Sequence, residues 1–181
     1  NALYYTRDVK SSQDAFIEAV FNTPIPKPAA EQKKGFEALL TTSLGEECSL
    51  EVVQTVHDQI CQRIEMHKEA KVPDALLITK EDVKEVLQSC GVSDDHLSKF
   101  SVDYDEVFGF EADLHPKNVI DNKHFEIKTP DVVIKCDPTR SDLIETRVIG
   151  GVKYILICAD EDVEVNGVNI NIAEKKEPTA V

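Results

Sequence analysis

Six side chains between Asp103 and His115 are of types that bind metal ions, and four of them are the candidate ligands. Asp103, Asp105 and Asp113 carry carboxylate oxygens, and His115 carries an imidazole. Hard cations take oxygen ligands, but the spacing of a calcium-binding loop is absent, because Phe108 stands where that loop needs its sharp-turn glycine. Two interpretations stay open: a metal site that serves a hydrolase or nuclease, or a solvated acidic loop, the usual role of a charge run.

The segment 126–131 reads EIKTPD and holds pieces of a metal-dependent nuclease signature. In such enzymes carboxylates bind Mg²⁺ and a lysine assists the attacking water. Here the pieces occur in the wrong order, and alternating charges on the exposed side of a strand give the same letters. The segment therefore adds little to the enzymatic alternative.

His57 and Cys61 lie four residues apart, which places both on one side of a predicted helix. Together they could ligate a metal ion. A nucleophilic Cys–His pair elsewhere in the fold also stays open, because its partners would meet in space and not in sequence. Zinc would need two more ligands, and no paired spacing supplies them. The alternative is a histidine and a thiol in the packed core.

Residues 79–100 resemble a helix-turn-helix: a capped helix, a turn that contains Gly91, and a second capped helix. The second helix opens with Asp94 and Asp95, where contacts to DNA favour Arg, Lys or Asn. An ordinary pair of antiparallel helices explains the pattern as well. DNA binding through 79–100 is the weaker functional alternative.

The last candidates are Glu145, Arg147 and Tyr154, which share one side of a predicted hairpin. Gly150-Gly151 favours a two-residue turn, so Arg147 faces Tyr154, against which its guanidinium could stack. This polar side is either solvated or a binding surface. The other side carries mostly apolar residues and is predicted to face the core: Ile144, Thr146, Val148, Lys153, Ile155 and Ile157.

Capping signals position the helices before this hairpin. Ser49 is expected to cap a helix over 50–70, and Thr79 with Asp82 forms a capping box. Strand-forming residues dominate later. The sequence thus predicts an α+β fold, with a helical N-terminal half and a C-terminal antiparallel sheet built from hairpins. We expect a strand and helix lead-in over 1–23, helices over 24–117, the sheet over 118–172 and a disordered tail over 173–181.

Composition excludes several classes of function. The 34 acidic against 20 basic residues give a net charge of −14, which disfavours nucleic acids and anionic membranes. No apolar run is long enough to span a bilayer. The five cysteines are scattered and odd in number, as expected of reduced thiols in a cytoplasmic protein. No nucleophile elbow or glycine-rich phosphate loop occurs, and no cofactor is expected.

The strings MHKEAKVPDALLITKEDVKEVLQSCGVS and PDVVIKCDPTRSDLIETRVIGGVKYILICADEDVEVNGVNI resemble a bacterial family, domain of unknown function 4317. The likeness runs from Ala2 to Ile170. The chain resembles the C-terminal portion of longer members of the family, which agrees with a sequence that begins at Asn1 and not at Met. The resemblance implies no activity, cofactor or catalytic residue. We therefore expect a non-enzymatic binding or assembly domain of a larger bacterial cytoplasmic protein, with a protein partner or a second copy as its ligand.

Overall fold

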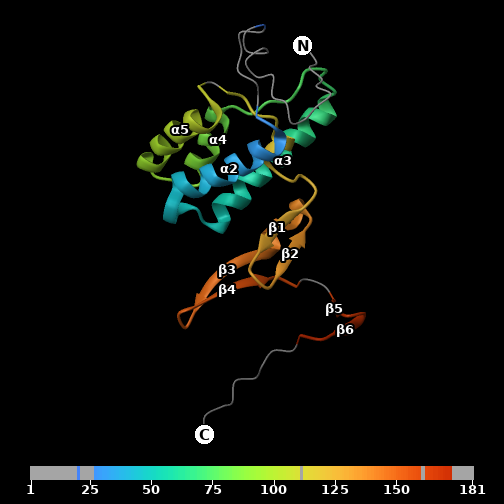
Figure 1. The fold of residues 1–181 in the computed structure, drawn as a ribbon. Helices are drawn as coiled ribbons and strands as arrows, with labels where there is room; N and C mark the ends of the chain where they lie inside the picture. The colour runs from blue at the N-terminus through green and yellow to red at the C-terminus, as the bar shows by residue number, and fades with distance from the viewer. Residues whose placement is uncertain (1–19, 21–26, 111, 160–161, 173–181) are drawn as a thin grey trace.

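The computed structural model describes residues 20, 27–110, 112–159 and 162–172. Helices occupy the first part of the described chain and β-hairpins the last part (Figure 1). The predicted α+β class is confirmed. The predicted lead-in over 1–23, apart from Val20, and the predicted tail over 173–181 lie outside the described residues.

The helix starts follow the capping signals. Helix α3 (Leu50–Ala70) begins after Ser49, whose hydroxyl accepts a hydrogen bond from the backbone of Val52 at 3.3 Å. Helix α4 (Lys80–Ser89) begins after Thr79, which forms the predicted reciprocal capping box with Asp82. Both boundaries are confirmed, since a cap satisfies backbone N–H groups that the helix itself leaves unpaired.

The remaining helices are α2 (Ala29–Leu44), α5 (Asp94–Phe108) and α6 (Pro116–Val119). A short 3-10 turn, η1 (Gly45–Glu47), follows α2. Helix α5 continues to Phe108, through residues for which a solvated acidic loop was one of the two interpretations left open by the sequence. Tyr104 explains the difference, because its side chain is fully buried and its hydroxyl donates to the Ala112 carbonyl at 2.7 Å.

These helices form one hydrophobic core, which we call the helical body. Helix α2 packs against α5 and α6, and α4 packs against both α3 and α5. An ion pair of 2.8 Å between Lys80 and Asp105 joins the start of α4 to α5. The residues least exposed in this core are Leu44, Ile78, Leu87, Phe100 and Tyr104. Within the described residues, no helix is both long and apolar enough to cross a membrane.

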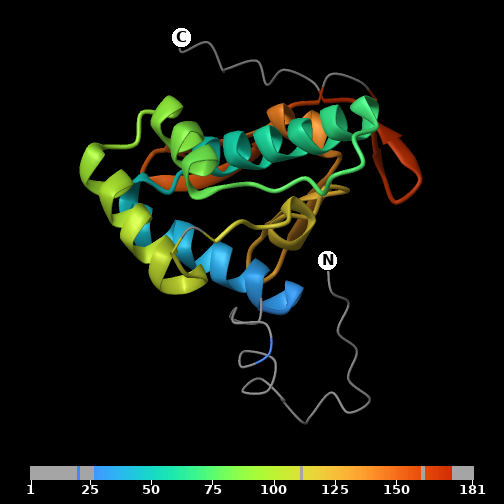
Figure 2. The ribbon, with the colours of Figure 1, turned by 90° about the horizontal axis from the view of Figure 1, so that it is seen from above.

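In the part of the chain that the structure describes, three two-stranded antiparallel sheets follow, in place of one predicted sheet. They pair β1 (Phe125–Lys128) with β2 (Val133–Cys136), β3 (Ile144–Ile149) with β4 (Val152–Ile157), and β5 (Val163–Val165) with β6 (Val168–Ile170). A 3-10 segment, η2 (Pro138–Leu143), connects β2 to β3. Figure 1 shows the β5–β6 hairpin apart from the helices, and in the view from above it lies near the end of α3 (Figure 2).

The register of the β3–β4 hairpin agrees with the prediction. Arg147 pairs with Tyr154, and Ile149 pairs with Val152 across the Gly150-Gly151 turn. Both glycines have positive φ, of 58° and 82°, which a two-residue turn of this type requires. The local sequence therefore specifies this pairing.

The prediction that one side of this hairpin faces the core is wrong. Ile144 is buried, but Val148 is 68%, Ile155 36% and Ile157 58% exposed. The helices bury their apolar residues against one another, and the hairpin contacts the helical body at its base. There the Gln54 side chain of α3 donates to the carbonyls of Ser141 and Ile144 at 2.8 and 3.0 Å.

Candidate functional site

The three predicted binding residues lie on the exposed β3–β4 hairpin. Glu145 and Arg147 form an ion pair of 2.9 Å along the strand, and Tyr154 is 42% exposed opposite Arg147. In the described structure no cation–π contact joins Arg147 to Tyr154, so the guanidinium is engaged by the carboxylate and not by the ring. The three side chains share one side of the hairpin, as predicted.

Apolar side chains surround this polar group on both sides of the hairpin. We call them the hairpin surface; its members are Val148, Ile149, Val152, Tyr154, Ile155 and Ile157. Their exposed fractions run from 36% for Ile155 to 68% for Val148. A shallow hollow of about 520 Å³ lies over part of the surface and is also bordered by Thr129, from the turn between β1 and β2.

The β3 edge of the hairpin is open. The Cys158 N–H donates to the Leu143 carbonyl at 2.7 Å, so the odd-numbered residues of β3 direct their backbone groups toward β4. The even-numbered residues Ile144, Thr146 and Val148 therefore direct theirs outward. The Gln54 amide reaches the outward carbonyl of Ile144, which agrees with this assignment. At Thr146 and Val148 the described chain supplies no second strand.

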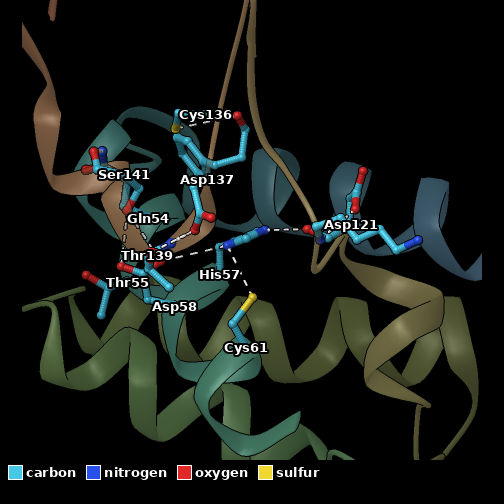
Figure 3. Close-up of polar contacts among 12 residues, drawn as sticks. Gln54, Thr55, His57, Asp58, Cys61, Asp121, Cys136, Asp137, Thr139 and Ser141 are labelled. Carbon is cyan, nitrogen blue, oxygen red and sulfur yellow. Dashed lines mark hydrogen bonds and ion pairs between the residues drawn. The ribbon is translucent and has the colours of Figure 1, made fainter. Parts of the chain in front are cut away.

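A second candidate is the pair formed by His57 and Cys61 on α3 (Figure 3). The Nε2 atom of His57 lies 2.9 Å from the Asp121 carbonyl, which can only accept a hydrogen bond. The ring therefore carries its proton on Nε2, and its Nδ1 is left to accept from the Cys61 thiol at 3.7 Å. This arrangement has the geometry of a weak thiol–imidazole pair.

The electrostatics of the pair oppose nucleophilic chemistry. Burial, and after it the nearby carboxylates of Asp58, Glu65 and Asp121, raise the pKa of the Cys61 thiol to about 11. Reactive cysteines need the opposite environment, because the thiolate is the nucleophile and positive charges stabilise it. At neutral pH Cys61 is therefore a neutral thiol.

Polar contacts around this pair fasten η2 onto α3. Asp58 accepts from the Ser141 hydroxyl at 3.3 Å, and Gln54 donates to the Ser141 carbonyl (Figure 3). A groove of about 370 Å³ runs between Cys61 and η2. Sequence reasoning missed Gln54, Asp58 and Ser141, because partners more than 80 residues apart leave no local pattern.

The predicted metal ligands are placed on different elements. Asp103 and Asp105 lie on α5, where Asp103 accepts from the Ser43 hydroxyl at 2.8 Å and Asp105 pairs with Lys80. His115 precedes α6 and lines a pocket that none of the three predicted aspartates lines. Among the residues that the structure describes, no group of three or more His, Cys, Asp or Glu side chains gathers to hold a metal ion.

The charged residues of 126–131 lie on the β1–β2 hairpin. Glu126 forms a cross-strand ion pair with Lys135 at 2.8 Å, and this hydrogen bond and charge lower the pKa of the Glu126 carboxyl. Such a pair is what alternating charges on a solvated strand produce.

Residues 79–100 form two packed helices, and the second, α5, carries Asp94 and Asp95 in its first turn. Leu87 and Phe100 are fully buried between this pair and the rest of the helical body. The segment therefore contributes to the core.

The chain matches the model of one family, the domain of unknown function DUF4317, over residues 1–168. The match covers nearly the whole chain and not only a C-terminal portion, so the chain belongs to this family. The comparison with curated proteins and the comparison with solved structures gave no match.

Proposed function

We propose that this DUF4317 protein is a non-enzymatic assembly module that pairs with a second copy of itself along the open edge of β3. The observation that carries the proposal is the exposure of the hairpin surface. A two-stranded hairpin is at best marginally stable in water by itself, and exposed contiguous apolar residues mark interaction sites. A partner strand along the β3 edge would add backbone hydrogen bonds and side-chain contacts that the two strands lack by themselves.

Backbone chemistry restricts how two copies of β3 can pair. Thr146 and Val148 direct their N–H and C=O groups outward, so in an antiparallel pair they must meet outward-directed residues of the partner strand. An even-numbered residue therefore faces an even-numbered residue. A two-fold axis through the pair is the commonest symmetry of homodimers and makes the contact reciprocal.

Charge favours one register over its two neighbours. With Thr146 opposite Thr146 of the second copy, Glu145 of each chain faces Arg147 of the other. A shift of the partner strand by two residues in one direction places Glu145 opposite Glu145, and the opposite shift places Arg147 opposite Arg147. Like charges directly opposite destabilise a sheet, whereas opposite charges stabilise it.

The resulting sheet would have four strands and a broader apolar side. Val148, Ile155 and Ile157 of both copies would lie on it. The carbonyl of Ile144 already accepts from Gln54. Because a carbonyl oxygen has two lone pairs, this bond leaves room for a second donor at the end of the new ladder.

The experiment measures molar mass by sedimentation equilibrium and by light scattering over a range of concentrations. The wild type is expected to dimerise in a concentration-dependent way. Thr146→Pro removes an outward N–H that β4 does not use, so it should leave a folded monomer.

Charge exchange provides the matched control. Glu145→Arg should weaken the dimer about tenfold or more, because Arg then faces Arg, and the double exchange Glu145→Arg/Arg147→Glu should restore it. A wild type that stays monomeric at all concentrations would refute pairing with a second copy. A dimer that Thr146→Pro leaves unchanged would place the interface elsewhere.

A further inference from the structure

A pocket with a basic lining lies at the C-terminal end of α3. Its lining combines the last turns of α3, residues 75–76, and the start of α6, and its volume is about 390 Å³. Its polar lining consists of His67, Lys68, His115, Lys117 and Asn118. Segments that are about 40 residues apart in sequence thus meet around one cavity.

The composition of this lining differs from that of the chain. Acidic residues outnumber basic ones by 34 to 20 overall, yet no Asp or Glu lines this pocket. Two lysines and two histidines do. A concave site lined by one sign of charge concentrates ligands of the opposite sign.

Some of these polar groups are held in place and others are available. His67 bonds the Asp74 carbonyl at 2.8 Å, and the Asn118 amide donates to Gln32 at 3.2 Å. Lys68 shares its charge with Glu65, a neighbour on α3. Within the described residues, the side chains of Lys117 and His115 form no hydrogen bond or ion pair, so both can turn to a ligand.

The rest of the pocket is apolar. Ile64 and Pro116 are buried beneath it, and Leu76 and Ala75 complete the wall. A bare inorganic ion would leave this wall in contact with water. A ligand that carries a short apolar body beside its charge would cover it.

We propose that this pocket binds a small organic anion, a phosphate or a carboxylate attached to a short apolar body. Lys117 and His115 contact the charged head, and Ile64, Leu76 and Pro116 contact the body. The proposal is independent of dimerisation, since none of these residues lies on the β3–β4 hairpin.

The experiment titrates the full chain with phenyl phosphate, benzoate, inorganic phosphate and phenol, and follows amide shifts by NMR. Phenyl phosphate or benzoate should give saturable shifts at residues 67–68, 75–76 and 115–118, and the better of the two identifies the head group. Inorganic phosphate should bind more weakly, because it leaves the apolar wall uncovered. Phenol that binds as tightly as both anions, or no saturable shift with either anion up to about 10 mM, would overturn the proposal.

Two variants test the two parts of the site separately. Lys117→Gln should weaken binding of the preferred anion about tenfold, since it removes a charged donor. Lys34→Gln, on the exposed side of α2, makes the same charge change away from the pocket and should have no effect. Ala75→Trp should block binding without a change of charge. Equal binding by Lys117→Gln, or undiminished binding by Ala75→Trp, would place the ligand outside this pocket.

Discussion

The helical body and the β3–β4 hairpin are both rich in apolar residues, but they place them differently. In the helical body Leu44, Leu87 and Phe100 are fully buried. In the hairpin Val148 and Ile157 are more than half exposed. Burial of a large apolar side chain contributes roughly 1.5–3 kcal/mol to folding, a contribution that the hairpin residues do not receive within one chain.

The difference indicates separate roles for the two regions. The helical body supplies stability, and its polar groups cap helices and form ion pairs within it. The hairpin takes its register from the Gly150-Gly151 turn, and its side chains remain available. Changes in the helical body should therefore alter folding, whereas changes at the tip of the hairpin should alter association.

The largest expected effect is that of Phe100→Ala on the free energy of unfolding. Removal of a fully buried aromatic ring leaves a cavity, and a loss of about 3–5 kcal/mol is expected. Urea denaturation followed by circular dichroism measures it. Val148→Ser, the matched change on the hairpin, should alter the stability of the monomer by less than about 0.5 kcal/mol. Equal losses for both variants would remove the distinction between the two regions.

A second test concerns the thiol of Cys61. With its pKa raised to about 11, Cys61 should react with iodoacetamide at pH 7.5 about 100-fold more slowly than an ordinary exposed thiol. Mass spectrometry of peptides after timed alkylation gives the rate, and Cys158, exposed after β4, serves as the internal reference. Alkylation of Cys61 as fast as that of Cys158 would reopen the nucleophilic interpretation.

The joint between the two regions can be weakened by Gln54→Ala. The carbonyls of Ser141 and Ile144, at the base of the hairpin, then lose their donor. The free energy of unfolding is expected to fall by about 1–3 kcal/mol. Hydrogen exchange at residues 143–146 should become faster. Gln62→Ala, an exposed change on the same helix, is the control and should leave that exchange unchanged.

The smallest effect is the pH dependence due to Asp82. Although burial opposes it, hydrogen bonds from Thr79 and Arg63 hold the pKa of Asp82 below its ordinary value of 3.8. The ionised carboxylate therefore stabilises the fold above about pH 4, and this contribution is lost as the pH falls through the lowered pKa. Asp82→Asn should lower the free energy of unfolding at pH 7 by about 1 kcal/mol, which is measured as a lower Tm. The difference from wild type should shrink below pH 4; a constant difference would exclude the linkage.

Local signals predicted much of the fold, and long-range packing accounts for the rest. Ser49 and Thr79 each satisfy backbone groups within three residues, so the starts of α3 and α4 follow from the sequence. The continuation of α5 to Phe108 depends on burial of Tyr104 against distant segments. The alternation of side chains along β3 predicted which residues share a side of the hairpin. It does not indicate whether helices cover that side.

The candidate sites show the same division. Glu145, Arg147 and Tyr154 were grouped correctly, because a two-residue turn fixes their register. His115 was grouped with aspartates that are near it in sequence, whereas the fold places it beside His67. Proximity along the chain predicted neighbours within a hairpin and failed for a pocket that three segments build.

Lys153 on β4 has a consequence for the growth of larger assemblies. An open strand edge can recruit further strands without limit, and a charged residue directed from such an edge is a common defence against fibres. After β3 pairs with its copy, the remaining outer edges would belong to β4. The pairing of two β4 edges that aligns Lys153 with itself is repulsive, so Lys153 disfavours that register of further growth.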